Sequence, residues 1–151
     1  MAAPPAFPPP GSLRAKAVNT MGSLNVVAYR LSGGRLGGRM QQLPVLLLEH
    51  IGRKSGQART APLLYLQDGD DLVIVASRGG SDATPAWWLN LQAQPRATVE
   101  IRGARRQVIA RQATAEEKAR LWPELVRGYS HYAVYQQRTS REIPVIILSP
   151  A

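Results

Sequence analysis

The spacing of apolar residues predicts an amphipathic helix near the start of the chain. From Ser12 onward, apolar residues recur at steps of three and four positions, and they are Leu13, Ala17, Met21, Leu24, Ala28 and Leu31. This spacing places them on one face of a helix over residues 12–31. Ser12 is a suitable N-cap and Gly33 a suitable end. The opposite face is basic, so the helix is amphipathic.

Apolar runs of strand length follow, separated by turn residues. They are Leu43–Ile51, Arg59–Gln67, Leu72–Ser77, Ala97–Arg102, Arg105–Ala113 and Ile143–Leu148. Asp68-Gly69 and Gly103-Ala104 are typical of tight hairpin turns. We therefore expect six strands, mostly antiparallel, with the first three arranged as a meander.

Three further helices are predicted between these strands. Thr84 can cap a helix over Pro85–Gln92, because proline suits the first helical position. Thr114-Ala-Glu-Glu117 matches a capping box, so a helix begins there and runs to about Gly128 with a break at Pro123. Tyr129–Arg138 is predicted to add a short helix. The pattern predicts a mainly β fold, a small barrel that is closed or half-open and carries helices.

Composition limits the class of protein. A chain of 151 residues fits one domain, and residues 1–11, with five prolines and no charge, predict an extended, mobile tail ahead of a domain over 12–151. The absence of cysteine excludes disulfides, thiolate metal sites and a cysteine nucleophile. Two isolated histidines argue against a metal site. No apolar stretch is long enough to span a membrane, so a cytoplasmic location is expected.

The positive charge is concentrated in the first part of the chain. The formal net charge is +9, and residues 1–66 hold eight basic side chains against one acidic side chain. Such an asymmetry indicates an anionic partner, and nucleic acid, lipid headgroups and a phosphorylated small molecule all fit.

The densest candidate chemistry is the segment Gly52–Arg59, GRKSGQAR, at a turn between two strands. Its glycines allow a phosphate to approach the backbone, and Arg53, Lys54 and Arg59 would neutralise it. The spacing is not that of a Walker A loop. A solvated basic turn is the alternative interpretation.

Three other clusters carry candidate chemistry. Ser77 and Arg78 end a strand before two glycines, although no base is placed to activate a serine nucleophile. Trp87 and Trp88 are adjacent on a short helix, where one is expected in the core and the other is free to lie against a flat ring. A row of phenols at helical spacing either lines a site or packs in the core, and it consists of Tyr129, Tyr132 and Tyr135.

In this order, the clusters resemble the deazaflavin-dependent nitroreductase family, oxidoreductases that use the 8-hydroxy-5-deazaflavin coenzyme F420. The resemblance runs from about Leu36 to Pro150, and it rests on Leu43-Pro44-Val45, GRKSGQAR, Asp68–Gly80, TPAWWLNL, the ATAEE and LWPELV segments, the tyrosine row and the final IPVIIL. It implies a six-stranded split β-barrel of the FMN-binding type, with the deazaflavin in a groove. The family is typical of actinobacteria.

The resemblance also implies roles for individual residues. The coenzyme tail would contact Arg53, Lys54, Ser55, Arg59, Thr60 and Arg78. The ring would contact Pro62, Leu63, Val75, Ala76, Ser77, Trp87, Asn90 and Tyr132. Ser77, Tyr129, Tyr132 and Tyr135 would be the catalytic groups beside the acceptor, and no metal is implied.

One departure from the family pattern affects the expected acceptor. Active nitroreductases of the family can carry a tyrosine directly after the Pro-Leu pair, where this chain has Leu64, with Tyr65 one position later. On a strand, a shift of one residue points the side chain to the opposite face. A quinone acceptor is therefore favoured over nitroimidazoles.

The sequence thus predicts an F420H2-dependent reductase that transfers hydride to a planar acceptor such as a quinone, and nitroaromatics remain a second acceptor class. The helix over 12–31 is predicted to contact the inner face of the membrane or to cover the acceptor pocket, with an ordinary packed helix as the alternative. Two other functions stay open: a basic nucleic-acid-binding module, and an FMN or F420 barrel without turnover. The first is weakened because the arginines lie among glycines rather than beside exposed aromatic residues.

Overall fold

The computed structural model describes residues 3–4, 24–35 and 37–151. These residues form a curled antiparallel sheet of eight strands, namely β1 (Arg39–Met40), β2 (Leu43–Ile51), β3 (Ala58–Leu64), β4 (Leu66–Asp68), β5 (Asp71–Val75), β6 (Arg96–Ile101), β7 (Ala104–Gln112) and β8 (Val145–Pro150). The helices are the 3-10 turn η1 (Arg78–Gly80), α2 (Ala86–Ala93), α3 (Ala115–Gly128) and α4 (His131–Gln137). Residues 24–31 are also helical.

The sheet curls until its two ends are joined by one bent strand. Its order is β1-β2-β6-β7-β8-β5-β4, and β3 pairs with the other edge of β2. Only Tyr65 separates β3 from β4, and its N–H donates to the Pro44 carbonyl of β2 at 3.0 Å. The pairings therefore form a ring of six strands when β3 and β4 are taken as one. The predicted mainly β fold with a barrel and helices is confirmed.

Several predicted boundaries differ from the structure. The predicted strand Arg59–Gln67 is divided at Tyr65, so that β3 pairs with β2 while β4 pairs with β5, in place of a simple meander. The short strand β1 was not predicted, and β8 lies two residues later than expected. The division at Tyr65 was not predicted because the apolar residues on both sides of it give no signal for a bend.

The helices also differ in detail. α3 continues through Pro123 instead of breaking there, and its predicted capping box is present, with the Thr114 hydroxyl accepting from the Glu117 N–H at 3.2 Å. Pro85, rather than Thr84, occupies the N-cap position of α2. α4 begins at His131, so Tyr129 lies in the junction between α3 and α4.

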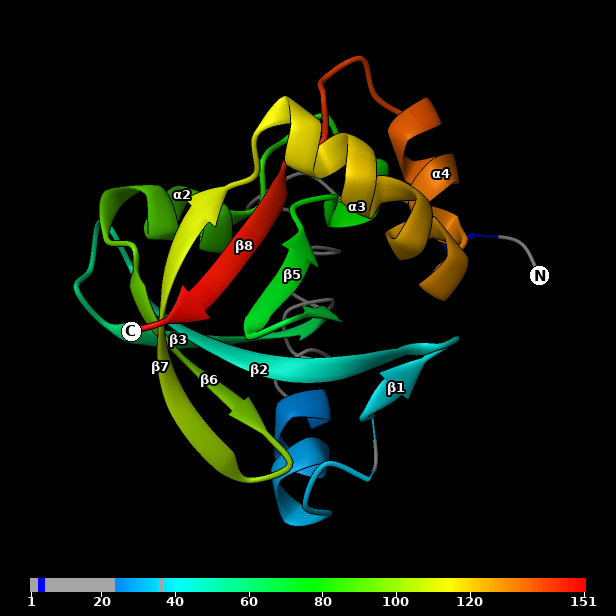
Figure 1. Cartoon of the computed structure of the whole chain (residues 1–151). Coiled ribbons are helices and arrows are strands. Elements are labelled where there is room, and N and C mark those ends of the chain that lie inside the picture. Colours follow the sequence, from blue (N-terminus) through cyan, green and yellow to red (C-terminus); the bar gives the residue numbers. More distant parts are fainter. Residues whose placement is uncertain (1–2, 5–23, 36) are drawn as a thin grey trace.

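Strands β5 and β8 are buried on both faces of the sheet, which explains their apolar character. Leu72, Ile74 and Leu148 face the barrel interior, where α2 contributes Trp87 and Trp88 to the same cluster. The intervening residues, such as Val73, Val75 and Ile147, face α3 and α4. In Figure 1, α2, α3 and α4 lie on one side of the molecule and the helical residues 24–31 on the other.

The helical residues 24–31 pack through a different face from the predicted one. Val26 and Tyr29 are buried against β2, and the Tyr29 hydroxyl donates to the Val45 carbonyl and accepts from the Arg102 N–H at 2.8 Å. Leu24 and Leu31 of the predicted apolar face are 64% and 85% exposed. The remainder of the predicted helix over 12–31 lies outside the described residues.

Of the predicted mobile tail, residues 1–11, only Ala3 and Pro4 are described, and they lie near α4. Arg138 of the α4 C-terminus donates to both of their carbonyls. Among the described residues, no helix combines the length and apolar character needed to cross a bilayer.

Candidate functional site

The basic segment forms a tight hairpin between β2 and β3. Gly52 donates its N–H to the Gln57 carbonyl at 2.8 Å, and Ser55 accepts from the Gln57 N–H. A Cβ atom at Gly52 would lie 2.6 Å from the Ser55 hydroxyl, so a larger residue here would displace the Ser55 side chain. The turn exposes the side chains of Arg53, Lys54 and Arg59 to solvent. We call residues 52–59 the basic loop.

A buried amide of α2 holds the basic loop in place. The Asn90 Oδ1 atom accepts from the Arg53 backbone N–H at 3.1 Å and from its guanidinium at 3.0 Å. The Asn90 amide nitrogen lies 3.0 Å from Nδ1 of His50, which therefore acts as the acceptor. Burial, and then the charge of Arg59, lower the pKa of His50, which favours this neutral form. Asn90, for which the family resemblance implies a ring contact, anchors the loop in the structure.

Among the described residues, the cations of the basic loop have no acidic partner. In the described part of the chain, no carboxylate lies within 4.0 Å of Arg53, Lys54 or Arg59. Other arginines do form such pairs, for example Arg120 with Asp68 at 2.9 Å. The loop therefore presents three positive charges that no described carboxylate compensates, on a fixed backbone, and this arrangement suits a polyanionic ligand.

The end of β5 is held by an arginine that the sequence analysis did not single out. The Arg141 guanidinium donates to the carbonyls of Ala76 at 3.2 Å, Ser77 at 2.9 Å and Ser81 at 2.8 Å. Burial lowers the pKa of Arg141. This clamp fixes the backbone on both sides of Ser77, which is itself buried.

The segment after Ser77 packs against α4. Arg78, Gly79 and Gly80 all have positive φ angles, and a Cβ atom at Gly80 would lie 2.7 Å from the Tyr135 carbonyl. Arg138 donates to the Gly79 carbonyl at 3.2 Å, and its guanidinium lies 5.5 Å from the centre of the Tyr135 ring. The backbone after Ser77 is thereby tied to the helix that carries two of the predicted tyrosines.

The three predicted tyrosines lie together in one cluster. The ring centres of Tyr129 and Tyr132 are 4.9 Å apart, and those of Tyr132 and Tyr135 are 6.2 Å apart. The hydroxyls of Tyr129 and Tyr135 are joined by a hydrogen bond of 2.9 Å. His131, which was not predicted, packs edge-on against Tyr129 with ring centres 5.0 Å apart. Although Tyr129 precedes α4, the predicted grouping of the three rings is therefore present.

Burial keeps the phenols of Tyr132 and Tyr135 protonated. It is the main cause that raises the pKa of Tyr132 and of Tyr135 well above the usual value of 10, and the neighbouring tyrosines raise both further. Neutral hydroxyls in an apolar environment are hydrogen-bond donors. We call Tyr129, Tyr132 and Tyr135 the tyrosine cluster.

The other predicted contacts divide between the two faces of the sheet. Val75 packs with the tyrosine cluster, as does the partly buried Leu64. Leu63 and Ala76 pack with the barrel interior. Trp87 and Trp88 both belong to that interior, so neither presents an exposed ring. Thr60 and Pro62 are partly exposed on β3.

In Figure 1 the basic loop lies at the left, beside α2, and α4 lies at the right. Residues 76–85 connect the end of β5 to α2, so the chain runs from the tyrosine cluster toward Asn90. The class of protein defined by these features is a coenzyme-dependent oxidoreductase built on a split β-barrel.

Comparison with known proteins identifies the family. A model of the F420H(2)-dependent quinone reductase family matches residues 22–150. Two proteins of Mycobacterium tuberculosis named for this activity are 45% identical over 117 residues, with 77% of this chain and 98% of the relative covered, and 40% identical over 130 residues, with 83% and 87% covered. The chain therefore belongs to the F420H(2)-dependent quinone reductase family, and its cofactor is coenzyme F420.

A solved structure supports the same conclusion. The F420-H2 dependent reductase FDR-A is 34% identical, with a TM-score of 0.65 and coverage of 70% of this chain and 94% of its own. The split-barrel fold and the deazaflavin coenzyme predicted from the sequence are thus confirmed. The mycobacterial relatives also agree with the expected actinobacterial family.

Proposed function

We propose that this protein transfers hydride from F420H2 to a quinone, with the basic loop binding the coenzyme tail and the tyrosine cluster facing the acceptor. The observation that carries the proposal is the basic loop itself, because its three cations have no acidic partner among the described residues while Asn90 fixes its backbone. Family membership supports this activity over a nucleic-acid-binding module and over a barrel without turnover.

The residues of the basic loop fit the polyanionic tail of F420. Arg53, Lys54 and Arg59 supply charge-assisted hydrogen bonds, and Ser55 supplies a hydroxyl. Because the Arg53 side chain is already held by Asn90, it loses less conformational entropy when the coenzyme binds. When bound, the reduced deazaflavin supplies the hydride from carbon 5 of its ring.

The tyrosine cluster fits the needs of an acceptor that gains electrons. A quinone oxygen becomes negative as it is reduced, and a neutral phenol beside it stabilises that charge by donating a hydrogen bond. In the hydrogen bond between Tyr129 and Tyr135, only one of the two protons is used. The other phenol of the pair keeps its proton available for the acceptor, as does Tyr132.

The position of Leu64 favours quinones over nitroaromatics. Leu64 packs beside the tyrosine cluster, whereas Tyr65 belongs to the barrel interior. The expected reversal of side-chain direction between these two positions is therefore present. The additional phenol of the active nitroreductases has no counterpart on the acceptor side.

The test measures coenzyme binding and turnover separately. Titration with F420 and with FMN gives dissociation constants, and steady-state rates with F420H2 and menadione give kcat. Replacing Lys54 with alanine should weaken F420 binding by roughly tenfold or more, the loss of one charge-assisted hydrogen bond, with little change in kcat. Arg127→Ala, which removes an exposed cation of α3, is the matched control and should leave binding within about twofold.

Phenylalanine variants test the acceptor side of the proposal. Tyr132→Phe and Tyr135→Phe keep the packing and remove only the hydroxyl, so kcat should fall while the F420 dissociation constant stays constant. Stronger binding of FMN than of F420, or equal F420 affinity in Lys54→Ala and the parent, would contradict the coenzyme assignment. Unchanged kcat in both phenylalanine variants would remove the phenols from catalysis.

We propose further that the N-terminal segment brings the protein to the inner face of the membrane, where quinones dissolve. Support comes from the apolar side chains that residues 24–31 leave exposed, since Leu24, Val27 and Leu31 are 64%, 52% and 85% exposed. Sedimentation with anionic phospholipid vesicles should decrease in Leu31→Glu but not in Ile109→Glu, a control on β7 that is 41% exposed. Equal sedimentation of both variants and the parent would exclude this contact.

A further inference from the structure

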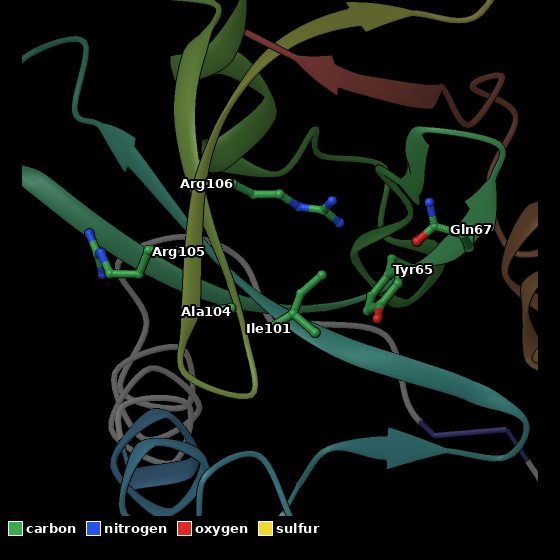
Figure 2. A pocket seen from close by; sticks show the side chains of 6 residues that line it. All are labelled: Tyr65, Gln67, Ile101, Ala104, Arg105 and Arg106. Atoms are coloured by element: carbon green, nitrogen blue, oxygen red, sulfur yellow. The ribbon is translucent and has the colours of Figure 1, made fainter.

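A pocket lies at the mouth of the barrel, away from the basic loop and the tyrosine cluster. It has a volume of about 340 Å³ and is lined by Tyr65, Gln67, Ile101, Ala104, Arg105 and Arg106. Figure 2 shows it between β4 and the hairpin of β6 and β7. None of these lining residues carries a carboxylate. We call this cavity the mouth pocket.

The two arginines of the hairpin differ in direction and in pairing. Figure 2 shows Arg106 extending toward Tyr65 and Gln67, whereas Arg105 points the other way. Arg105 pairs with Glu49 and Glu100, each at 3.2 Å. Within the described ranges, Arg106 has no carboxylate inside 4.0 Å. The guanidinium aimed into the mouth pocket is therefore the uncompensated one.

Tyr65 adds a hydroxyl at the wall of the pocket. The residue as a whole is only 9% exposed and packs in the barrel interior, while its side chain lines the mouth pocket. A hydroxyl at a pocket wall can exchange its water for a ligand oxygen without losing its hydrogen bond. Burial, and then Tyr29, raise the pKa of Tyr65, while the charges of Arg106, Arg102 and Arg39 act in the opposite direction.

The mouth pocket and the basic loop lie at opposite ends of β2. Tyr65 is bonded to Pro44 at the start of this strand, and the basic loop begins at Gly52, after its end. At about 3.3 Å per residue, the two ends are roughly 25 Å apart along the strand. Tyr65 also faces the barrel interior, on the opposite side from the tyrosine cluster. The mouth pocket is thus separate from both groups of the proposed site.

We propose that the mouth pocket binds a small organic carboxylate. The Arg106 guanidinium pairs with the carboxylate, the Tyr65 hydroxyl donates to it, and Ile101 with the tyrosine ring covers the apolar body. The apolar floor favours an organic acid over inorganic phosphate. The volume is at the lower end for ligand pockets, so the acid is small. This inference does not depend on the proposed quinone reductase activity.

Calorimetric titration of the full chain with benzoate tests the proposal. Arg106→Gln should weaken benzoate binding roughly tenfold or more, and Tyr65→Phe should weaken it severalfold, because each removes one donor. Arg127→Gln removes the same charge elsewhere and should change the affinity by less than about twofold. Inorganic phosphate at the same concentrations should bind the parent protein at least severalfold more weakly than benzoate.

Three results would overturn the proposal. These are equal loss of benzoate binding in Arg127→Gln and Arg106→Gln, phosphate binding as tight as benzoate binding, and no benzoate binding to the parent at millimolar concentration. F420 titration separates the two sites, since Arg106→Gln should leave the F420 dissociation constant unchanged. If F420 displaced benzoate competitively, the mouth pocket would belong to the coenzyme site and the inference would be wrong.

Discussion

Removing the guanidinium of Arg141 should destabilise the fold and disturb the backbone at Ser77. The substitution Arg141→Met keeps an unbranched apolar side chain in place of the stem and deletes every donor. In the described residues, the carbonyls of Ala76 and Ser81 accept hydrogen bonds from Arg141 alone, whereas the Ser77 carbonyl also accepts from the Gly80 N–H at 2.9 Å. Two carbonyls would therefore lose their partner, and one of them belongs to a fully buried residue, Ala76.

The expected loss follows from these two carbonyls. A buried polar group left without a partner costs about 1–3 kcal/mol, and water reaching the rim near Ser81 offsets part of that cost. We expect the free energy of unfolding to decrease by about 3 kcal/mol. For a chain of this size, such a change lowers the melting temperature by roughly 5–12 °C.

Thermal and urea unfolding measure the change, with Arg127→Met as the control for loss of one exposed positive charge. The control should stay within about 0.5 kcal/mol of the parent. If Ser77 acts beside the acceptor, as the family resemblance implies, kcat with menadione should also decrease at temperatures where the variant is folded, while the F420 dissociation constant is retained. A melting temperature within about 2 °C of the parent would show that the clamp contributes no stability and would refute the reasoning.

Two further predictions concern the loop anchor and the contact with α4. The lowered pKa of His50 means that the folded state favours the neutral ring. The contribution of the neutral His50 ring to the free energy of unfolding is therefore complete above the usual pKa of 6.5, and it is lost as the pH falls toward the lowered pKa. Urea midpoints of the parent and His50→Gln should therefore diverge in pH dependence only below that value, and parallel curves would contradict the assignment. Gly80→Ala should cost about 2–4 kcal/mol through its φ of +82° and the clash with the Tyr135 carbonyl, whereas Gly56→Ala, at a φ of +70° with nothing within 4 Å, should show only the backbone strain of about 1–2 kcal/mol. Equal losses in chemical denaturation would mean that packing against α4 is not the cause.

Features that depend on residues a few positions apart were predictable from the sequence. The capping box of α3 depends on Thr114 and Glu117, three positions apart, and both of its hydrogen bonds are present. The hairpin at the basic loop follows from glycines at both ends of a short polar segment. By contrast, the division at Tyr65 depends on which strand pairs with each half of the run, and that choice is made between residues far apart in sequence.

The candidate site, too, could be predicted only where its residues lie close together in the sequence. The types of residue in the basic loop and the tyrosine cluster indicated their chemistry before their positions were known. The roles of Asn90 and Arg141 could not be predicted, because each bonds to backbone atoms of another element, 37 and about 60 to 65 positions away. The burial of both tryptophans also follows from the curvature of the sheet around α2 rather than from the helix itself.

The place of β8 in the ring has a consequence for how the protein is made. This strand pairs with β5 on one edge and β7 on the other, although it is the last strand along the chain. During synthesis, the edges of β5 and β7 that pair with β8 therefore have unpaired backbone groups until β8 has left the ribosome. Such unpaired edges can form hydrogen bonds with strands of other chains, which leads to aggregation. Substitutions that weaken β8 should accordingly reduce the yield of soluble protein in cells before any loss of turnover is detected in the molecules that do fold.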